Sequence, residues 1–76
     1  MKEKDLIKLG FVNESYEDDG NHFTEFVLKT DDFIIEYYGV DMVEIKLPYV
    51  NWIDVPNCKH LQDMKDLIRL FSKSPD

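Results

Sequence analysis

Three runs of alternating apolar and polar residues constrain the fold of this chain more than any other feature. They are HFTEFVLK (22–29), FIIEYY (33–38) and MVEIKL (42–47). Successive side chains of a strand point to opposite faces, so this period of two predicts β-strands. The TDD and GVD triplets between the runs are turn signals. We therefore expect an antiparallel meander.

Helical patterns flank these runs at both ends of the chain. Residues 1–10 have leucines at helical spacing and end at Gly10, where a left-handed C-cap residue fits. Residues 57–72 begin with Asn57 as the expected N-cap. They then carry an apolar stripe at helical spacing, formed by Leu61, Met64, Leu67, Ile68 and Phe71.

The remaining segments are expected to add to the sheet. Residues 11–16 are interpreted as a short strand. Residues 49–55 lie between two prolines, which cannot donate to a ladder, so they form an edge strand or an extended loop. The predicted fold class is α+β, a three- to four-stranded antiparallel meander within residues 11–55, flanked by a short N-terminal and a longer C-terminal helix. The whole chain, 1–76, is expected to be one domain.

One face of this sheet is expected to become the core, because each buried large apolar side chain contributes roughly 1.5–3 kcal/mol. The helices would cover Phe26, Leu28, Phe33, Ile35, Tyr37, Val43, Ile45 and Leu47. The other face would display Phe23, Glu25, Val27, Ile34, Glu36, Tyr38, Met42, Glu44 and Lys46. Its apolar members predict an exposed patch of the kind that marks contact surfaces.

On that second face the expected register sets glutamates against one another. The GVD turn places Glu36 opposite Glu44, and a four-residue KTDD turn brings Glu25 opposite Glu36. Like charges directly opposed cost a few tenths to about 1 kcal/mol, which a cation on a partner would relieve. Two alternatives stay open. The carboxylates are solvated and splay apart, or residues 11–16 or 49–55 fold over the face and make it core.

Negative charge is concentrated in the middle of the chain. Residues 13–54 hold eleven acids against Lys29 and Lys46, a net charge of −9, whereas residues 1–12 and 55–76 are each net +1. A domain that holds phosphates is normally basic, so direct nucleic-acid binding is not expected. A basic protein surface is the expected partner.

The segment NESYEDDGN forms a second acidic site, with Glu14, Glu17, Asp18 and Asp19 around Tyr16. It is either a solvated turn or a mimic of phosphate charge, since carboxylates two apart on a strand lie about 6–7 Å apart. A calcium loop is the least favoured interpretation, because the D-x-D-x-D-G spacing and the distal glutamate are missing.

The sequence shows no pattern typical of catalysis or of a metal site, and we expect no enzyme activity, metal or cofactor. Cys58 and His60 form C-x-H, and His22 is the only other histidine, short of the four ligands of structural zinc. One cysteine excludes an internal disulfide, and the first residues have no signal-peptide core. The expected location is the cytoplasm.

Two structural motifs resemble those of small proteins encoded by phages and prophages of Bacteroidota-type bacteria. That group opens with a helix ending in L-x-x-L-G-F, matched here by Leu6, Leu9, Gly10 and Phe11. It closes with a polar cap and L-x-x-L-x-x-L, matched by Leu61, Met64 and Leu67 with Met for Leu. The resemblance implies an α-meander-α fold and a mobile-element origin, and it supplies no site residues. Small acidic phage proteins often inhibit defence nucleases, including CRISPR effectors, by occupying basic nucleic-acid grooves.

The favoured function is therefore a non-enzymatic binding protein of the anti-CRISPR type, which docks its acidic face on a basic nucleic-acid-binding protein. The expected partner-binding residues are Tyr16, Glu17, Asp18, Asp19, Phe23, Glu25, Glu36, Tyr38, Glu44 and Trp52. Trp52 is either an anchor for the partner or a cap over the sheet edge. The alternative function is a homodimeric structural or regulatory module that pairs through its exposed strand face or through residues 49–55.

Overall fold

The computed structural model describes residues 1–39 and 42–72. Its elements are α1 (Glu3–Lys8), β1 (Val12–Asn13), β2 (Tyr16–Asp18), β3 (Asn21–Phe23), β4 (Phe26–Lys29), β5 (Ile34–Tyr37), β6 (Val43–Lys46), β7 (Ile53–Asp54) and α2 (Leu61–Phe71). The predicted α+β class is confirmed. No helix within the described ranges is long and apolar enough to cross a membrane.

The strands form two antiparallel sheets. A five-stranded sheet has the order β1-β4-β5-β6-β7, and β2 and β3 form a separate hairpin. The predicted meander is the centre of the larger sheet, where β4, β5 and β6 pair in sequence. Residues 11–16 and 49–55 contribute β1 and β7, which widen this sheet by one strand at each edge. They do not fold over its face, so the sheet has more strands than the three or four predicted.

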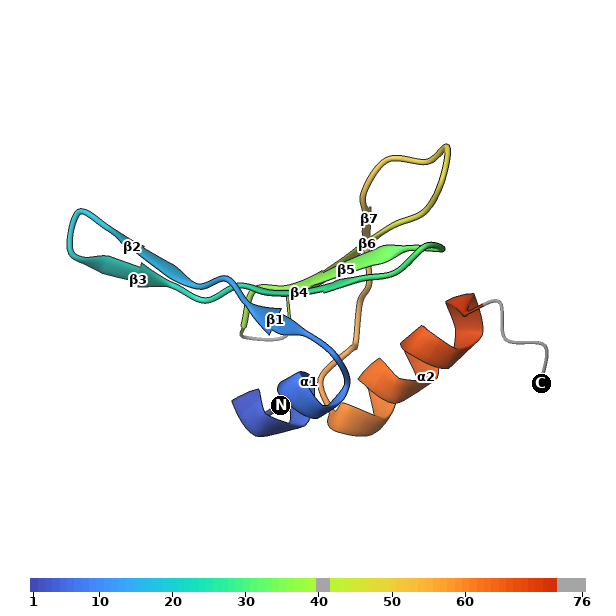
Figure 1. Cartoon of the computed structure of the whole chain (residues 1–76), viewed down its shortest axis with the longest axis horizontal. Coiled ribbons are helices and arrows are strands. Elements are labelled where there is room, and N and C mark those ends of the chain that lie inside the picture. Colours follow the sequence, from blue (N-terminus) through green and yellow to red (C-terminus); the bar gives the residue numbers. More distant parts are fainter. Residues whose placement is uncertain (40–41, 73–76) are drawn as a thin grey trace.

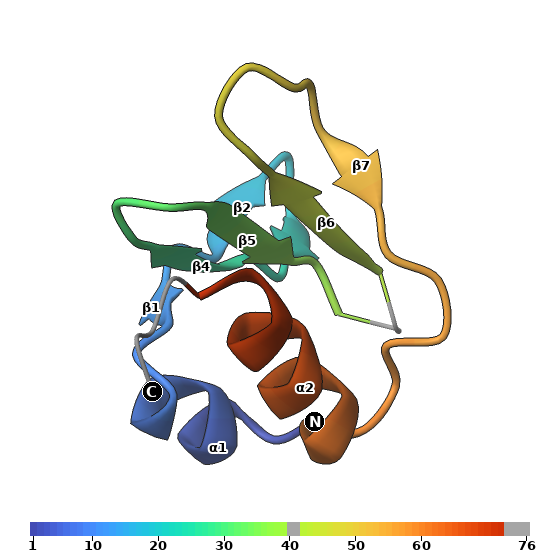
Figure 2. The same ribbon diagram turned by 90° about the vertical axis from the view of Figure 1, so that its right-hand side faces the viewer.

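Both helices lie on the same side of the five-stranded sheet (Figures 1 and 2). The side chains predicted for the covered face are buried or, in the case of Leu47, packed against the buried cluster. Leu6, Phe11, Cys58, Met64 and Leu67 complete this core from the helices and their flanks. The prediction of the core face is therefore confirmed.

Helix α1 ends at the predicted cap. Gly10 has φ +104°, in the left-handed region where glycine is favoured. Its N–H donates to the carbonyl of Ile7 (3.0 Å), and the N–H of Phe11 donates to the carbonyl of Leu6 (3.0 Å). This pair of bonds turns the chain back over the helix and buries Phe11. The regular helix is shorter than the predicted range 1–10, since it spans Glu3–Lys8.

Helix α2 begins at Leu61, so the predicted start at residue 57 is wrong. Asn57 has φ +61° and lies in a left-handed turn, whereas an N-cap residue needs an extended backbone. His60 is the N-cap, and the Asp63 carboxylate accepts the N–H groups of His60 (3.0 Å) and Lys59 (3.2 Å). These backbone donors lower the pKa of Asp63.

The run 22–29 forms two strands, so the prediction of a single strand is wrong. β3 ends at Phe23 and β4 begins at Phe26, because the chain changes partners between them. Ser15 stabilises this break. Its Oγ accepts the N–H of Glu25 (3.0 Å) and donates to the carbonyl of Glu25 (3.5 Å).

Candidate functional site

The outer face is the side of the five-stranded sheet turned away from α1 and α2 (Figure 1). Its residues alternate along each strand with those of the core. The loop between β6 and β7 rises beyond this side at one end, and the β2-β3 hairpin extends past the sheet at the other (Figure 1). The outer face therefore lies between two projecting segments.

Three carboxylates stand side by side across the outer face. Glu36 pairs with Glu44 across β5 and β6, as predicted, and Glu44 pairs with Asp54 across β6 and β7. Directly opposed residues have Cβ atoms about 4.5–5.5 Å apart. We call Glu36, Glu44 and Asp54 the acidic row. Because Glu44 is its middle member, it is opposed by a like charge on both sides.

The predicted pairing of Glu25 with Glu36 is wrong by two residues, because the β4-β5 turn is TDDF rather than KTDD. The carbonyl of Phe33 accepts the N–H of Thr30 (2.9 Å), and the ladder places Val27 opposite Glu36. Glu25 therefore lies beyond the end of the row. Burial raises its pKa, and the charges of Glu36 and Glu14 and a hydrogen bond with Glu36 raise it further.

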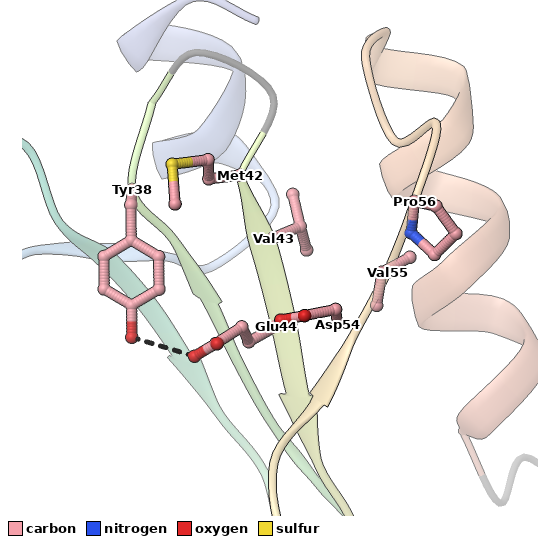
Figure 3. Close-up of a pocket in the computed structure, with 7 residues that line it drawn as sticks. All are labelled: Tyr38, Met42, Val43, Glu44, Asp54, Val55 and Pro56. Atoms are coloured by element: carbon pink, nitrogen blue, oxygen red, sulfur yellow. Dashed lines mark hydrogen bonds between the residues drawn. The ribbon is translucent and has the colours of Figure 1, made fainter.

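Tyr38 lies on the outer face beside the acidic row and donates its hydroxyl proton to it. The Oη–Oε1 distance is 2.7 Å to Glu36 and 3.3 Å to Glu44, the second contact being drawn in Figure 3. A phenol has one proton, so the shorter bond takes it and Glu44 is left with the weaker contact. Burial, the bond to Glu36 and the two negative charges raise the pKa of Tyr38, which keeps its proton.

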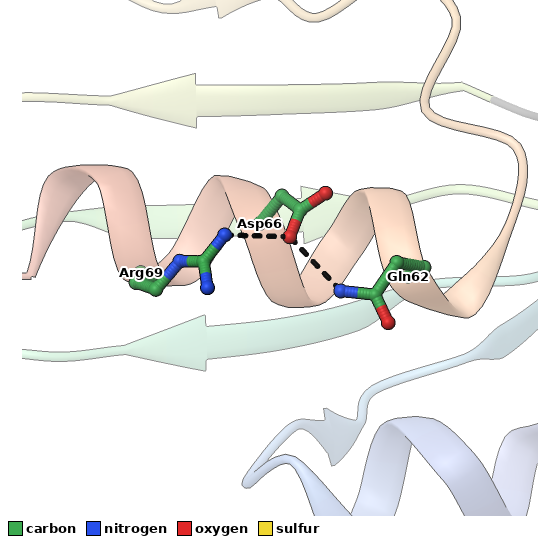
Figure 4. Close-up of polar contacts among 3 residues, drawn as sticks. All are labelled: Gln62, Asp66 and Arg69. Carbon is green, nitrogen blue, oxygen red and sulfur yellow. Dashed lines mark hydrogen bonds and ion pairs between the residues drawn. The ribbon is translucent and has the colours of Figure 1, made fainter.

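No lysine, arginine or histidine among the described residues pairs with the acidic row, with Glu25 or with Glu14 at 4.0 Å or less. Lys29 and Lys46 lie farther along the strands, and Lys46 Nζ donates to the carbonyl of Val50 (3.2 Å). Helix α2 shows the contrast, because Asp66 accepts from Arg69 (3.0 Å) and from Gln62 (2.9 Å) (Figure 4). The acidic row thus forms no ion pair with a described residue, and Lys29 and Lys46 stand at the next outward-facing positions of the same face.

The predicted apolar patch on this face is confirmed only at one end. Val27 is buried between its neighbours, and Ile34 and Tyr38 are half-buried. Met42 is 61% exposed, but Phe23 belongs to the β2-β3 hairpin instead of this sheet. The exposed apolar surface is therefore centred on Met42.

The β2-β3 hairpin brings together the second group of predicted site residues. Its two-residue turn has φ +52° at Asp19 and +79° at Gly20, the conformation that a tight hairpin requires. Tyr16 pairs with Phe23 and their rings stack at 5.1 Å. All three residues of β2, with Glu17 and Asp18, are exposed.

A shallow cavity of about 410 Å³ lies between this hairpin and the sheet. Tyr16 and Phe23 line it from the hairpin, and Glu25, Tyr38 and Met42 line it from the sheet. The structure therefore brings four predicted site residues, Tyr16, Phe23, Glu25 and Tyr38, to one place. Glu17, Asp18 and Asp19 lie on the same hairpin but do not line the cavity.

Trp52 does not line the cavity beside the hairpin. It precedes β7 and is 41% exposed, so it is not a buried cap over the sheet edge. Tyr49, Val50 and Ile53 are exposed beside it. These residues form an apolar edge beside Lys46, whose Nζ donates to the carbonyl of Val50.

Sequence reasoning missed Asp54 as a member of the site, and it placed Glu14 in the acidic NESYEDDGN segment without predicting its contact with Glu25. Asp54 was counted only in the overall charge because residues 49–55 had no predicted register. Its place follows only from the β6-β7 register, in which Ile53 pairs with Ile45 and Asp54 with Glu44. Glu14 joins because its N–H donates to the carbonyl of Glu25 (2.7 Å), which continues the β1-β4 ladder.

Within residues 1–39 and 42–72, no group of three or more His, Cys, Asp or Glu side chains is arranged to hold a metal ion. Asp41, in the predicted GVD turn, lies outside these residues. Comparisons with protein families, with curated proteins and with solved structures found no match to this chain.

Proposed function

We propose that this protein is a small acidic binding protein that docks its outer face on a basic protein surface. The acidic row carries this proposal, because it places like charges on three consecutive strands with no described cation in contact. Each opposed pair costs the free protein a few tenths to about 1 kcal/mol. A cation on a partner would convert this cost into binding free energy.

The neighbours of the acidic row support a contact surface. Met42, Tyr16 and Phe23 are exposed beside it, and Tyr38 is half-buried with a fixed hydroxyl. Aromatic side chains next to charged groups are typical of the residues that dominate binding energy. The surface thus combines charge, which speeds and orients association, with apolar anchors, which slow dissociation.

The most concrete partner is a nucleic-acid-binding effector, such as a CRISPR nuclease. Strand neighbours about 4.7–4.9 Å apart, and alternate residues about 6–7 Å apart, give the carboxylates a spacing comparable to that of phosphates along a strand. A row of acids could therefore occupy the basic groove of such an enzyme and compete with its nucleic acid. The resemblance to small phage proteins is compatible with this role as an inhibitor.

Affinity capture from a host bacterium, followed by charge reversal, tests the proposal. We expect the wild-type protein to capture a nucleic-acid-binding protein, and excess DNA or RNA to displace it. The double variant Glu36→Lys/Glu44→Lys should lose the captured protein, whereas Glu3→Lys/Asp66→Lys, which changes charge equally on the helices, should keep it. Capture that is indifferent to Glu36 and Glu44 would contradict the proposal.

The apolar edge at β7 favours a second candidate function, a homodimeric module. β7 is an edge strand with Ile53 exposed, and Tyr49, Val50 and Trp52 are exposed in the loop that precedes it. Unpaired edges with apolar side chains readily pair with another chain. Sedimentation equilibrium separates the candidates, because a dimer that is lost in Trp52→Ser supports this second function and a monomer at all concentrations excludes it.

A further inference from the structure

A groove of about 270 Å³ opens on the outer side of the β6-β7 pair (Figure 3). The groove lies where the β6-β7 ladder ends. The N–H of Val55 donates to the carbonyl of Val43 (2.9 Å), one pair beyond Glu44 and Asp54. Met42 and Pro56 lie past this bond, and their side chains form two walls of the groove.

The groove is apolar along its walls and acidic at one end. Val43 and Val55 line it together with Met42 and Pro56, and the carboxylates of Glu44 and Asp54 lie at the end where β6 and β7 are paired. The ring of Tyr38 lines the same groove from β5 (Figure 3). A ligand must therefore present an apolar stem and a cationic head.

The two carboxylates are free to accept such a head. Asp54 is exposed and is not ion-paired with any described residue, and Glu44 receives only the 3.3 Å contact from Tyr38. The hydroxyl proton of Tyr38 goes to Glu36 at 2.7 Å. The carboxylate oxygens of Glu44 and Asp54 therefore line a groove in which no described residue forms an ion pair with them.

We propose that this groove binds one arginine side chain of the basic partner. The inference rests on the proposed function and names the group that the outer face recognises. A guanidinium has five N–H donors in a planar fork, so it can bond two neighbouring carboxylates at once. Its flat face also packs on an aromatic ring, and its methylenes fit an apolar wall.

Lysine fits the same groove less well. Its ammonium is compact and strongly hydrated, so it loses more hydration on entering an apolar groove and contacts fewer acceptors in a fixed geometry. The larger cavity beside the hairpin has one carboxylate, Glu25, among its lining residues, and the pKa of that group is raised by burial. The groove with two free carboxylates is therefore the better guanidinium site.

Affinities for nona-arginine and nona-lysine, measured by isothermal titration calorimetry, test the inference. We expect wild-type protein to bind nona-arginine about threefold to tenfold more tightly. Asp54→Asn should weaken nona-arginine binding and remove most of this preference. The matched control Asp31→Asn, in the exposed β4-β5 turn, removes the same charge and should leave the preference intact.

Two results would overturn the inference in distinguishable ways. Equal affinity for the two peptides, with equal effects of Asp54→Asn and Asp31→Asn, would eliminate the arginine groove and leave the acidic face as a general cation-binding surface. No binding of either peptide to wild-type protein would contradict the proposed function as well. Both substitutions are at exposed positions, and amide NMR spectra of the variants would verify that they fold.

Discussion

The two faces of the five-stranded sheet are built from adjacent residues and serve opposite purposes. Ile35 and Ile45 are paired on the core face and almost fully buried, while Glu36 and Glu44, one residue along each strand, are paired on the outer face. The first pair stabilises the fold and the second opposes it. One alternation in the sequence therefore encodes both the fold and the surface that it presents.

The same two faces differ in whether their polar side chains have hydrogen-bond or ion-pair partners. The core face is closed by the helices and contains no buried side-chain N or O atom without a partner among the described residues. The outer face keeps three aligned carboxylates that form no ion pair with a described residue. Neutral residues at the three positions of the acidic row would give a more stable fold. The carboxylates there are therefore the residues to test for a role in binding.

The largest difference between the faces is expected from truncating neighbouring isoleucines of β5. Ile35→Ala should destabilise the protein by about 2–5 kcal/mol, because it removes a fully buried side chain and leaves a cavity. Ile34→Ala, on the outer face, should cost about 1 kcal/mol or less. Urea denaturation measures both, and equal losses would show that the outer face is also core.

Neutralising the middle of the acidic row should have the opposite sign. Glu44→Gln removes like-charge repulsion on both sides, so we expect the free energy of unfolding to rise by a few tenths to about 1 kcal/mol. The control Glu17→Gln lies on the hairpin opposite His22 and should change stability by less than about 0.5 kcal/mol. A loss of stability in Glu44→Gln would mean that the row is a structural feature.

The pH dependence of stability should separate the outer face from helix α2. The pKa of Glu25 is raised above its ordinary value of 4.5, so the folded state holds this proton more tightly and stability falls as pH rises above that value. The pKa of Asp63 is lowered from 3.8, so its contribution is present above 3.8 and is lost as pH falls through the lowered pKa.

We therefore expect maximal stability on the acidic side of neutral pH. Thermal melts across the pH range provide the measurement. Glu25→Gln should flatten the decline above pH 4.5 and leave the loss at lower pH unchanged. Asp63→Asn should reduce the loss of stability at low pH and leave the decline above pH 4.5 unchanged. If stability still declines above pH 4.5 in Glu25→Gln, groups other than Glu25 cause that decline.

The smallest effect is expected from salt in the absence of a partner. Screening weakens the repulsion along the acidic row, so added sodium chloride should stabilise the free protein by a few tenths of a kcal/mol. The same salt should weaken binding to a basic partner. Stability that falls with salt would indicate that favourable ion pairs outweigh the repulsion.

The core face could be predicted from the sequence because its residues repeat with a period of two over three strands. The β5-β6 register could also be predicted, since the short turn between the two strands fixes which residues oppose each other. The position of Glu25 could not be predicted, because KTDD and TDDF are equally acceptable turn sequences. Only the Thr30–Phe33 hydrogen bonds select the second turn.

Two features of the site depend on contacts between distant segments and could not be found by periodicity. β7 is two residues long, so no alternation marks it and Asp54 could not be assigned to a face. Residues 22–29 alternate regularly between the two faces, yet the strand is broken between Phe23 and Phe26. The break arises because β3 pairs with β2, whereas β4 pairs with β1 and β5. Pairing partners, rather than local preference, decide both features.

Mapping the binding surface for nona-lysine by amide NMR tests the central claim most directly, because it locates binding without requiring the arginine groove. We predict that the largest shifts on titration occur at Glu36, Tyr38, Glu44 and Asp54, with small shifts in α1 and α2. Shifts of equal size around the whole molecule, or shifts confined to Asp31 and Asp32 in the β4-β5 turn, would contradict the claim that the outer face is the cation-binding side.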